Sequence, residues 1–235
     1  MAEKLVVISD VHSNLHALEA VLTDVSRRGL GSAPLCFLGD AVNMGPFPGE
    51  VTRRLAALNP AYRVRGNHDR YLSSGAPRAE LERYFRCAEG ADHAEWTGAA
   101  LRAEDKAWLG SAPVQLAFRL GGAEFAAFHA SPGSDEKQFL PASLGRNILC
   151  GHIHSPYVVT LPDGGLAVNP GSVGSSLDGN TAASYAVVTV DGGVSAEIVR
   201  VKYDVEAFCG ALEARGAPWA AGIAAVVRRA GLFPK

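Results

Sequence analysis

The chain has 235 residues, of which 48% are hydrophobic and 20% are charged, as is ordinary for a globular protein with a substantial core. Its 22 Lys and Arg residues against 24 Asp and Glu residues give a formal net charge of −2, and no long run has one sign. This balance gives no strong sign of the basic surface that nucleic-acid binding needs. No apolar run reaches the roughly 20 residues of a membrane span. The four widely spaced cysteines predict reduced thiols, and we expect a cytoplasmic protein without a membrane partner.

The first part of the chain alternates between predicted strands and helices. Apolar, β-branched runs predict strands at 5–8, 35–38 and 62–64. Apolar residues at helical spacing predict one helix from Leu15 to just before Gly29 and a second over 49–58. This alternation is typical of a parallel sheet with crossover helices.

The stretch from about 70 to 112 has a different composition, rich in Ala, Glu and Arg. It predicts helices at 78–89 and 91–110, which we interpret as a helical insertion between two halves of the sheet system. After it, patterning predicts strands at 114–120, 123–128, 146–150, 156–161, 165–168, 184–190 and 194–201, then helices at 204–215 and 218–230. Without a linker or an internal repeat, the chain is predicted to be one domain over 1–235.

Five short motifs carry most of the histidines together with aspartate or asparagine. They are Asp10-Val11-His12, Gly39-Asp40, Gly66-Asn67-His68-Asp69, His129 and Gly151-His152-Ile153-His154. Imidazole and carboxylate are ligands for Mn²⁺, Fe, Ni²⁺ and Zn²⁺, and a pair of such ions is a known device for cleaving phosphate esters. Each motif alone has a plain structural explanation, as a turn or as a core histidine. Together they predict a two-metal site.

The positions of the motifs favour the metal interpretation. Three of them directly follow predicted parallel strands, and ligand sites in α/β sheets lie at the carboxyl ends of strands. Asp10 with His12, and His152 with His154, can each present two ligands on one side if the backbone is extended, because residues i and i+2 of a strand share a face.

The order of the five motifs resembles the signature of the calcineurin-like metallophosphoesterase superfamily. Residues 13–18, Gly45-Pro46 with Pro48, and 169–174 are similar to its small bacterial and archaeal phosphodiesterase branch. The last of these segments has two open interpretations, a tight loop or part of a pocket wall. Two positions depart from the branch pattern: Asn43-Met44 replaces glycine and an aromatic residue, and Ala130 replaces glycine after His129.

This resemblance implies a fold, an α/β/β/α sandwich of two packed sheets, and a set of metal ligands. One divalent ion would be held by Asp10, His12 and His154, the other by Asn67, His129 and His152, with Asp40 bridging the two. The family mechanism has a hydroxide between the metals attack phosphorus. The resemblance makes His68 a candidate catalytic side chain, as proton donor to the leaving oxygen or as stabiliser of the phosphoryl charge. Asp69 could orient His68 or be only a turn residue, and substrate-binding residues stay unassigned.

We therefore expect a dinuclear-metal phosphoesterase with Mn²⁺ the favoured ion and Fe, Ni²⁺ or Zn²⁺ as alternatives. Small phosphodiesters, including cyclic nucleotides, are the favoured substrates by analogy with small members of the family. The nearest alternative is a phosphomonoesterase, acting on phosphoproteins or dinucleoside polyphosphates. An alternative of another class is a catalytically silent scaffold on the same fold.

Overall fold

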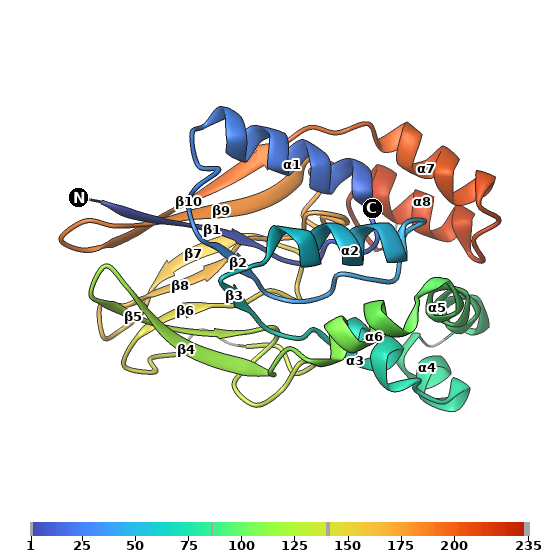
Figure 1. Ribbon diagram of the computed structural model, residues 1–235, viewed down its shortest axis with the longest axis horizontal. Helices are drawn as coiled ribbons and strands as arrows, with labels where there is room; N and C mark the ends of the chain where they lie inside the picture. Colours follow the sequence, from blue (N-terminus) through green and yellow to red (C-terminus); the bar gives the residue numbers. More distant parts are fainter. Residues whose placement is uncertain (1, 86, 140–141, 233–235) are drawn as a thin grey trace.

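The computed structural model describes residues 2–85, 87–139 and 142–232, which form two packed sheets with helices beside them (Figure 1). These residues contain ten strands: β1 (Glu3–Ile8), β2 (Leu35–Phe37), β3 (Tyr62–Arg63), β4 (Gln115–Leu120), β5 (Ala123–Phe128), β6 (Asn147–Leu149), β7 (Tyr157–Thr160), β8 (Leu166–Asn169), β9 (Ala183–Val190) and β10 (Val194–Val201). The same residues contain eight helices: α1 (Leu15–Arg27), α2 (Pro48–Leu58), α3 (Asn67–Ser74), α4 (Arg78–Phe85), α5 (Ala88–Ala100), α6 (Ala103–Gly110), α7 (Val205–Ala214) and α8 (Ala220–Arg229).

Each sheet has five strands, among which three neighbours are paired in parallel. The first has the order β10-β9-β1-β2-β3, and its strands β1, β2 and β3 are parallel, as the alternation of strands and helices predicts. The second has the order β4-β5-β6-β8-β7, with β5, β6 and β8 parallel and the outer strands β4 and β7 antiparallel to their neighbours. The carboxyl ends of the parallel strands, where the polar motifs begin, therefore share an edge in each sheet.

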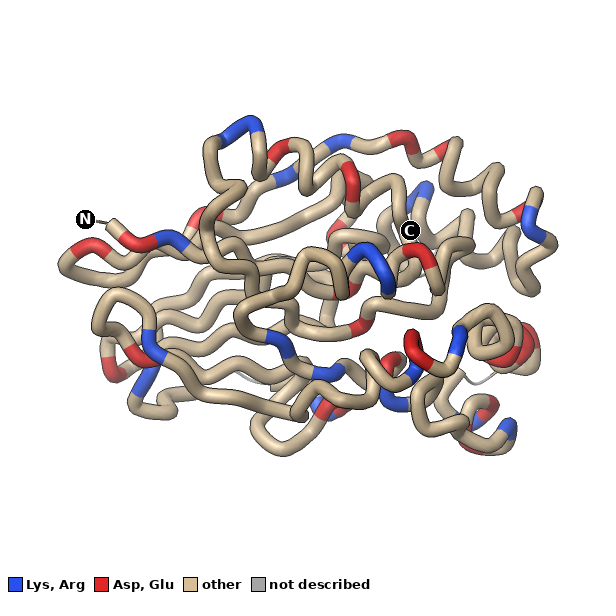
Figure 2. Tube along the Cα trace, in the orientation of Figure 1, with Lys and Arg blue, Asp and Glu red and all other residues tan. Residues whose placement is uncertain are grey.

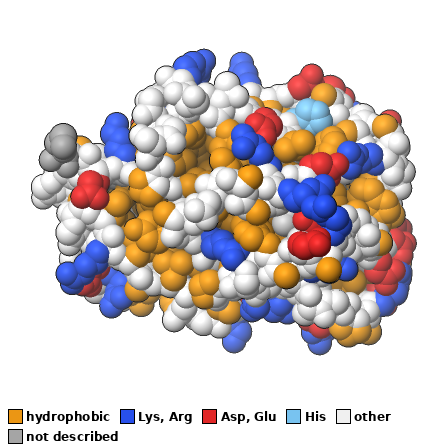
Figure 3. Space-filling model, viewed as in Figure 1, with side chains coloured by type: hydrophobic (Ala, Val, Ile, Leu, Met, Phe, Trp, Pro, Cys, Tyr) orange, Lys and Arg blue, Asp and Glu red, His pale blue; other side chains and the backbone are white. Residues whose placement is uncertain are grey.

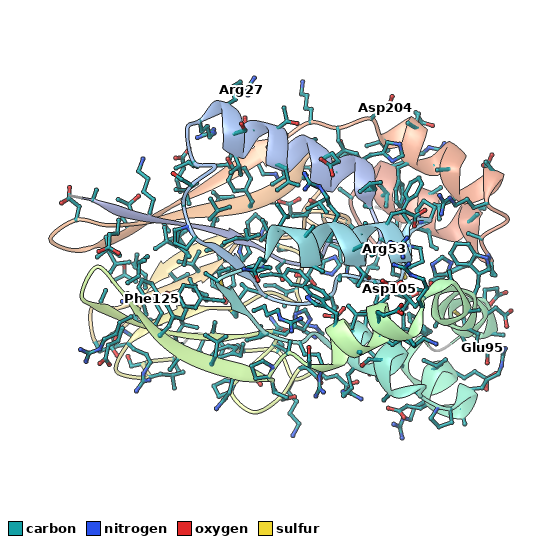
Figure 4. The ribbon with its side chains drawn as sticks, viewed as in Figure 1. Arg27, Arg53, Glu95, Asp105, Phe125 and Asp204 are labelled. Carbon is teal, nitrogen blue, oxygen red and sulfur yellow. The ribbon has the colours of Figure 1, made fainter. Side chains whose placement is uncertain are left out.

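Strand β1 lies between two apolar layers. Leu5 and Val7 are buried in the core between the sheets, together with Phe125 of the second sheet (labelled in Figure 4). Val6 and Ile8 belong to the core on the other side, which α1 and α2 cover. Because successive side chains of a strand point to opposite faces, a continuous apolar run suits a strand that is covered on both sides. Two packed sheets with helices against the first confirm the predicted α/β sandwich.

Helices α3 to α6 form one group (residues 67–110, here the helical segment) at the lower right of Figure 1. The helix predicted over 91–110 is in fact two helices, because Leu101 has extended backbone with φ −88° and ψ 130°. Asp105 then stabilises the start of α6 by accepting the backbone N–H of Arg102 at 3.1 Å. The helix predicted over 78–89 is also interrupted, since Cys87 is extended and α5 begins after it. The sequence did not predict α3.

Charged residues of both signs are interspersed around the outside of the molecule (Figure 2), as expected from the nearly balanced composition. Among the described residues, no helix has both the length and the apolar character that crossing a membrane requires.

Candidate metal centre

All of the predicted metal ligands lie in loops or at helix starts that directly follow parallel strands. The first sheet supplies Asp10 and His12 after β1, Asp40 after β2 and Asn67 after β3, whereas the second sheet supplies His129 after β5 and both His152 and His154 after β6. The site therefore lies where the ends of the two sheets meet.

Asp10, His12 and His154 form one tight group. The Nε2 atoms of His12 and His154 lie 3.0 Å apart. Asp10 Oδ1 lies 3.2 Å from His154 Nε2 and 3.7 Å from His12 Nε2. Two imidazole nitrogens and a carboxylate oxygen at such short range are a donor set that suits a borderline divalent cation.

Asp40 lies between the two sets of histidines. Its Oδ2 atom is 3.2 Å from His129 Nε2, 3.9 Å from His12 Nε2 and 4.0 Å from His68 Nε2. Asp40 thus lies close to imidazoles that come from both sheets.

Asn67 and His152 lie on the side of His129. The ring of His152 is 5.2 Å from that of His129, centroid to centroid, and its backbone N–H donates to Asp10 Oδ2 at 3.1 Å. The neighbouring N–H of His68 donates to Asp40 Oδ1 at 2.9 Å, which fixes Asn67 next to the same carboxylate. All seven predicted ligands thus lie at one end of the sandwich.

Backbone carbonyls set the orientation of two of the rings. Nδ1 of His129 donates to the carbonyl of Leu38 at 2.7 Å, and Nδ1 of His154 donates to that of Ser175 at 2.5 Å. A ring that donates from Nδ1 keeps the lone pair of Nε2 for another partner, and metal-binding histidines are commonly oriented in this way.

Three buried atoms at the site make no hydrogen bond within the described residues: Asp10 Oδ1, Asn67 Oδ1 and His129 Nε2. Asp10, Asn67 and His129 are each 0% exposed. A buried polar atom without a partner costs about 1–3 kcal/mol, so three at one place call for a partner from outside the chain. Since all three are electron-pair donors, a divalent cation fits them and a hydrogen-bond acceptor does not.

The charges of the site lead to the same conclusion. Burial disfavours the charged form of Asp40, but His129 and the neighbouring histidines outweigh it and hold the pKa of this carboxyl below its usual range. Burial likewise opposes a charge on His129, yet Asp40 raises the pKa of that imidazole to about 10. The interior therefore holds negative charge that attracts a positive partner, a place that a divalent cation can take from a proton.

The backbone of the ligand loops is left-handed at five of the predicted ligands. The φ angles are 56° at Asp10, 48° at His12, 59° at Asp40, 73° at His152 and 57° at His154. The extended backbone that the i, i+2 argument required is therefore not present in either pair. Non-glycine residues in this conformation cost on the order of 1 kcal/mol each, and such strain collects at functional sites.

Asp69 contacts backbone amides. Its two carboxylate oxygens accept the N–H groups of Asp40 and Ala41, both at 2.8 Å, and of Gly66 at 3.2 Å. No hydrogen bond to His68 occurs among the described residues. These contacts agree with the interpretation as a turn residue, since Asp69 joins the loop after β2 to the start of α3.

Three further residues contact the site although their types and positions did not predict it. Asn43 Nδ2 lies 2.9 Å from His68 Nδ1, and the hydroxyl of Tyr84 lies 3.4 Å from His68 Nε2. Ser172 Oγ donates to the carbonyl of Asp10 at 2.7 Å, so the 169–174 loop supports a ligand loop. The sequence had given two indications of these contacts: residues 169–174 resemble the family branch, and Asn43 departs from the pattern of that branch. Nothing in the sequence pointed to Tyr84.

Comparisons with known proteins agree with this geometry. The family model of the calcineurin-like phosphoesterase superfamily domain matches residues 4–193. An uncharacterized protein of Methanocaldococcus jannaschii is 34% identical over 224 residues, which cover 86% of this chain and 88% of that protein. A metallophosphoesterase from Sphaerobacter thermophilus is similar in structure, with a TM-score of 0.76 and 26% identity over 98% of this chain and 100% of the other.

A hypothetical protein from Pyrococcus horikoshii OT3 has the same fold, with a TM-score of 0.82 and 19% identity over 98% of this chain and 99% of the other. The signature motifs, the sandwich, the buried donor cluster and the family match support the same assignment. The chain belongs to the calcineurin-like phosphoesterase superfamily.

Proposed function

We propose that this protein is a phosphodiesterase that uses two divalent metal ions, with Mn²⁺ as the favoured ion, to hydrolyse small phosphodiesters. The observation that carries the proposal is the set of three buried donor atoms without hydrogen bonds, on Asp10, Asn67 and His129, beside the buried carboxylate of Asp40. A silent scaffold on this fold has no need to keep such costly groups unpaired.

In this proposal the ligands divide into two sets around one shared residue. Asp10, His12 and His154 would hold the first ion, Asn67, His129 and His152 would hold the second, and both would share Asp40. When bound, such a pair of ions polarises the phosphoryl group and lowers the pKa of a water molecule that can attack phosphorus. The protein's part is to fix the donors before substrate arrives, through the carbonyl partners of His129 and His154.

His68 is suited to stabilising charge on the phosphoryl group. Burial lowers the pKa of His68 to about 3, so the ring is neutral at pH 7. Asn43 Nδ2 can only donate a hydrogen bond, and His68 Nδ1 must accept it. The ring hydrogen is then on Nε2, where it can be donated to an oxygen of the substrate. Of the two roles implied for His68, stabilisation of charge fits a neutral ring better than transfer of a proton.

A diester is favoured over a monoester because it carries less negative charge and therefore needs fewer cationic side chains to bind it. The protein phosphatases of the superfamily have arginine after the Gly-Asp motif, where this chain has Asn43 and Met44. Among the described side chains that contact the predicted ligands and His68, none is Lys or Arg. On the face shown in Figure 3, cationic and anionic side chains are intermixed without a band of one sign, which favours a small substrate over a polymeric nucleic acid.

The test is hydrolysis of bis-p-nitrophenyl phosphate and p-nitrophenyl phosphate by chelator-stripped protein reconstituted with Mn²⁺. We expect turnover of the diester that requires Mn²⁺ and falls by about 10²-fold or more in His68→Ala. His16→Ala is the matched control, since His16 is a histidine outside the site, next to Phe47.

Each outcome assigns the protein differently. Diester turnover that follows Mn²⁺ supports the proposal and justifies a screen of cyclic nucleotides. Turnover of the monoester alone makes the protein a phosphomonoesterase. If neither ester is cleaved with Mn²⁺, Fe, Ni²⁺ or Zn²⁺, the scaffold alternative replaces the enzyme.

A further inference from the structure

Tyr84, on helix α4, is where the helical segment reaches the candidate metal centre. Its hydroxyl accepts a hydrogen bond from Asn67 Nδ2 at 3.0 Å and lies 3.4 Å from His68 Nε2. Its ring meets that of His68 edge-on, with centroids 5.3 Å apart and planes at 88°. One hydroxyl group thus contacts a proposed ligand and the proposed charge-stabilising histidine.

The Asn67 amide meets Tyr84 with its nitrogen and faces the centre with its oxygen. Asn67 Nδ2 is turned toward Tyr84, and Oδ1 is turned into the buried space where it makes no hydrogen bond with described residues. Only the oxygen of an amide can hold a cation, because the NH₂ group has no free electron pair. With Nδ2 on the Tyr84 hydroxyl, Oδ1 is the end of the amide that faces the centre, as metal binding needs.

The hydrogens of the neighbouring groups explain why the Tyr84 oxygen acts as an acceptor. Asn43 Nδ2 donates to His68 Nδ1, which leaves the ring hydrogen on Nε2, where it faces the Tyr84 oxygen. Before substrate binds, that oxygen accepts one hydrogen bond from His68 and one from Asn67. Its own hydrogen is left to point away from both.

We propose that Tyr84 is a positioning residue of the centre, through the hydrogen-bonded series Asn43–His68–Tyr84–Asn67. This inference rests on the proposed function. Tyr84 holds the Asn67 oxygen toward the second ion, and it holds Nε2 of His68 at the site, so that one hydroxyl group supports both metal affinity and turnover.

The position of α4 is fixed by contacts on both of its sides. Leu81 is 3% exposed and belongs to the core beneath the helices. Arg78 contacts Asp92 at 2.7 Å and Glu95 (labelled in Figure 4) at 2.9 Å, which joins α4 to α5. Tyr84 therefore reaches the site from a helix that is anchored elsewhere.

The test compares Tyr84→Phe with Tyr71→Phe in the Mn²⁺-loaded full-length protein. Both changes remove one hydroxyl, but the Tyr71 hydroxyl makes no hydrogen bond to the site among the described residues, although its ring lies 5.0 Å from that of Tyr84. Retained Mn²⁺ is measured by atomic absorption after dialysis against graded chelator. In Tyr84→Phe we expect one of two ions to be held about 10–100-fold more weakly, as for other groups that orient metal ligands. Tyr71→Phe should behave as wild type.

Kinetics on bis-p-nitrophenyl phosphate separate the two effects of Tyr84. We expect kcat to fall about 10-fold in Tyr84→Phe at saturating Mn²⁺, with KM nearly unchanged. Asn43→Gly, which tolerates the positive φ of 71° at this position, should lower kcat without changing Mn²⁺ retention, because Asn43 contacts His68 but not Asn67.

Wild-type Mn²⁺ retention in Tyr84→Phe would overturn the inference while leaving the proposed function intact. An equal loss in Tyr71→Phe would overturn it too, since the effect would then come from packing. A wild-type protein that neither retains two ions nor cleaves the diester would refute the proposed function itself, and the role of Tyr84 with it.

Discussion

Aspartates are buried in two regions of this molecule, on the outer helices and at the strand ends, and the pairing of their oxygens differs. Asp24 of α1 accepts a hydrogen bond from the hydroxyl of Tyr185 at 2.8 Å. Asp105 of α6 accepts one from Arg53 at 2.9 Å, a pair labelled in Figure 4. By contrast, Asp10 at the end of β1 has an oxygen, Oδ1, that makes no hydrogen bond with described residues although the side chain is fully buried.

This difference separates two uses of a buried charge. A carboxylate that stabilises the fold is paired within the protein, because an unpaired charge in the interior costs several kcal/mol. A carboxylate that is left partly unpaired weakens the fold unless something binds to it. Pairing, more than burial, therefore distinguishes Asp10 from the buried aspartates of the outer helices, Asp24 and Asp105.

The largest effect is expected from Asp40→Asn, which changes the proposed bridge. The amide keeps an acceptor for the N–H of His68 but loses the charge and one of two metal-binding oxygens. We expect diester turnover to fall by at least about 10³-fold, or roughly 4 kcal/mol of transition-state stabilisation, with loss of at least one Mn²⁺ per chain. Metal content after gel filtration and kcat/KM give the measurement.

The control for Asp40→Asn is Asp191→Asn, in the exposed turn between β9 and β10. Two ions retained at full occupancy in Asp40→Asn would show that Asp40 is not the bridge.

The second largest effect is expected from Asp69→Asn. The carboxylate of Asp69 lies beside the site and is already paired with backbone N–H groups. Because it accepts three backbone N–H groups, the loss of one acceptor oxygen should lower the free energy of unfolding by about 1–3 kcal/mol. Urea unfolding measures this change. Asp163→Asn is the matched control, since Asp163 also accepts backbone N–H groups but is exposed, and its effect should be smaller. A loss of turnover without a loss of stability would instead favour a role for Asp69 in orienting His68.

A third prediction concerns pH and the paired carboxylate of Asp24. Burial raises the pKa of this group, but the hydrogen bonds from Tyr185, Arg27 and Arg28 outweigh burial and bring the pKa below its usual value. Its contribution to stability is therefore present above the unfolded pKa near 4 and is lost as the pH falls through the lower folded pKa. We expect Asp24→Asn to cost on the order of 1 kcal/mol at pH 7, and the difference from wild type to shrink below about pH 4. Urea unfolding at both pH values measures it, and a constant difference would contradict the prediction.

The smallest effect is expected from Arg53→Gln. The Arg53 side chain is 43% exposed, and solvent-exposed ion pairs contribute less than about 1 kcal/mol. Asp105 keeps its bond from the N–H of Arg102 in this variant, so it is not left unpaired. Asp105→Ala removes these two bonds and a third from Arg102 Nε, and it should cost more, about 1–2 kcal/mol by thermal unfolding. Equal effects of the two variants would show that the ion pair contributes more than the helix cap.

The sequence predicted the strands well because their side chains form continuous apolar runs, such as 5–8, that only a covered strand explains. It also predicted which loops meet, because parallel strands bring their carboxyl ends together. The break at Leu101 was missed because alanine-rich sequence on both sides is helical by propensity, whereas the cap at Asp105 is a local contact. The left-handed backbone of His12 and His154 was missed because residue types at i and i+2 do not reveal φ.

The contacts of Tyr84 were beyond any sequence pattern. Tyr84 and Asn67 are 17 residues apart, on different helices, and only the tertiary fold brings the end of α4 to the start of α3. A sequence motif also does not separate catalytic from structural residues. The neighbours of Asp69 in its motif suggested that it orients His68, whereas it accepts hydrogen bonds from the N–H groups of Asp40 and Ala41 and so fixes a loop.

The division of the proposed ligands between the two sheets has a mechanical consequence. Asp10, His12, Asp40 and Asn67 follow strands of one sheet, and His129, His152 and His154 follow strands of the other. Separating the sheets would therefore require giving up the ions as well as the apolar core between them. Binding that occurs only in the folded state adds its free energy to folding, so the same ions would act as a cross-link across the sandwich. The supply of metal would then affect the stability of the folded protein as well as its rate of turnover.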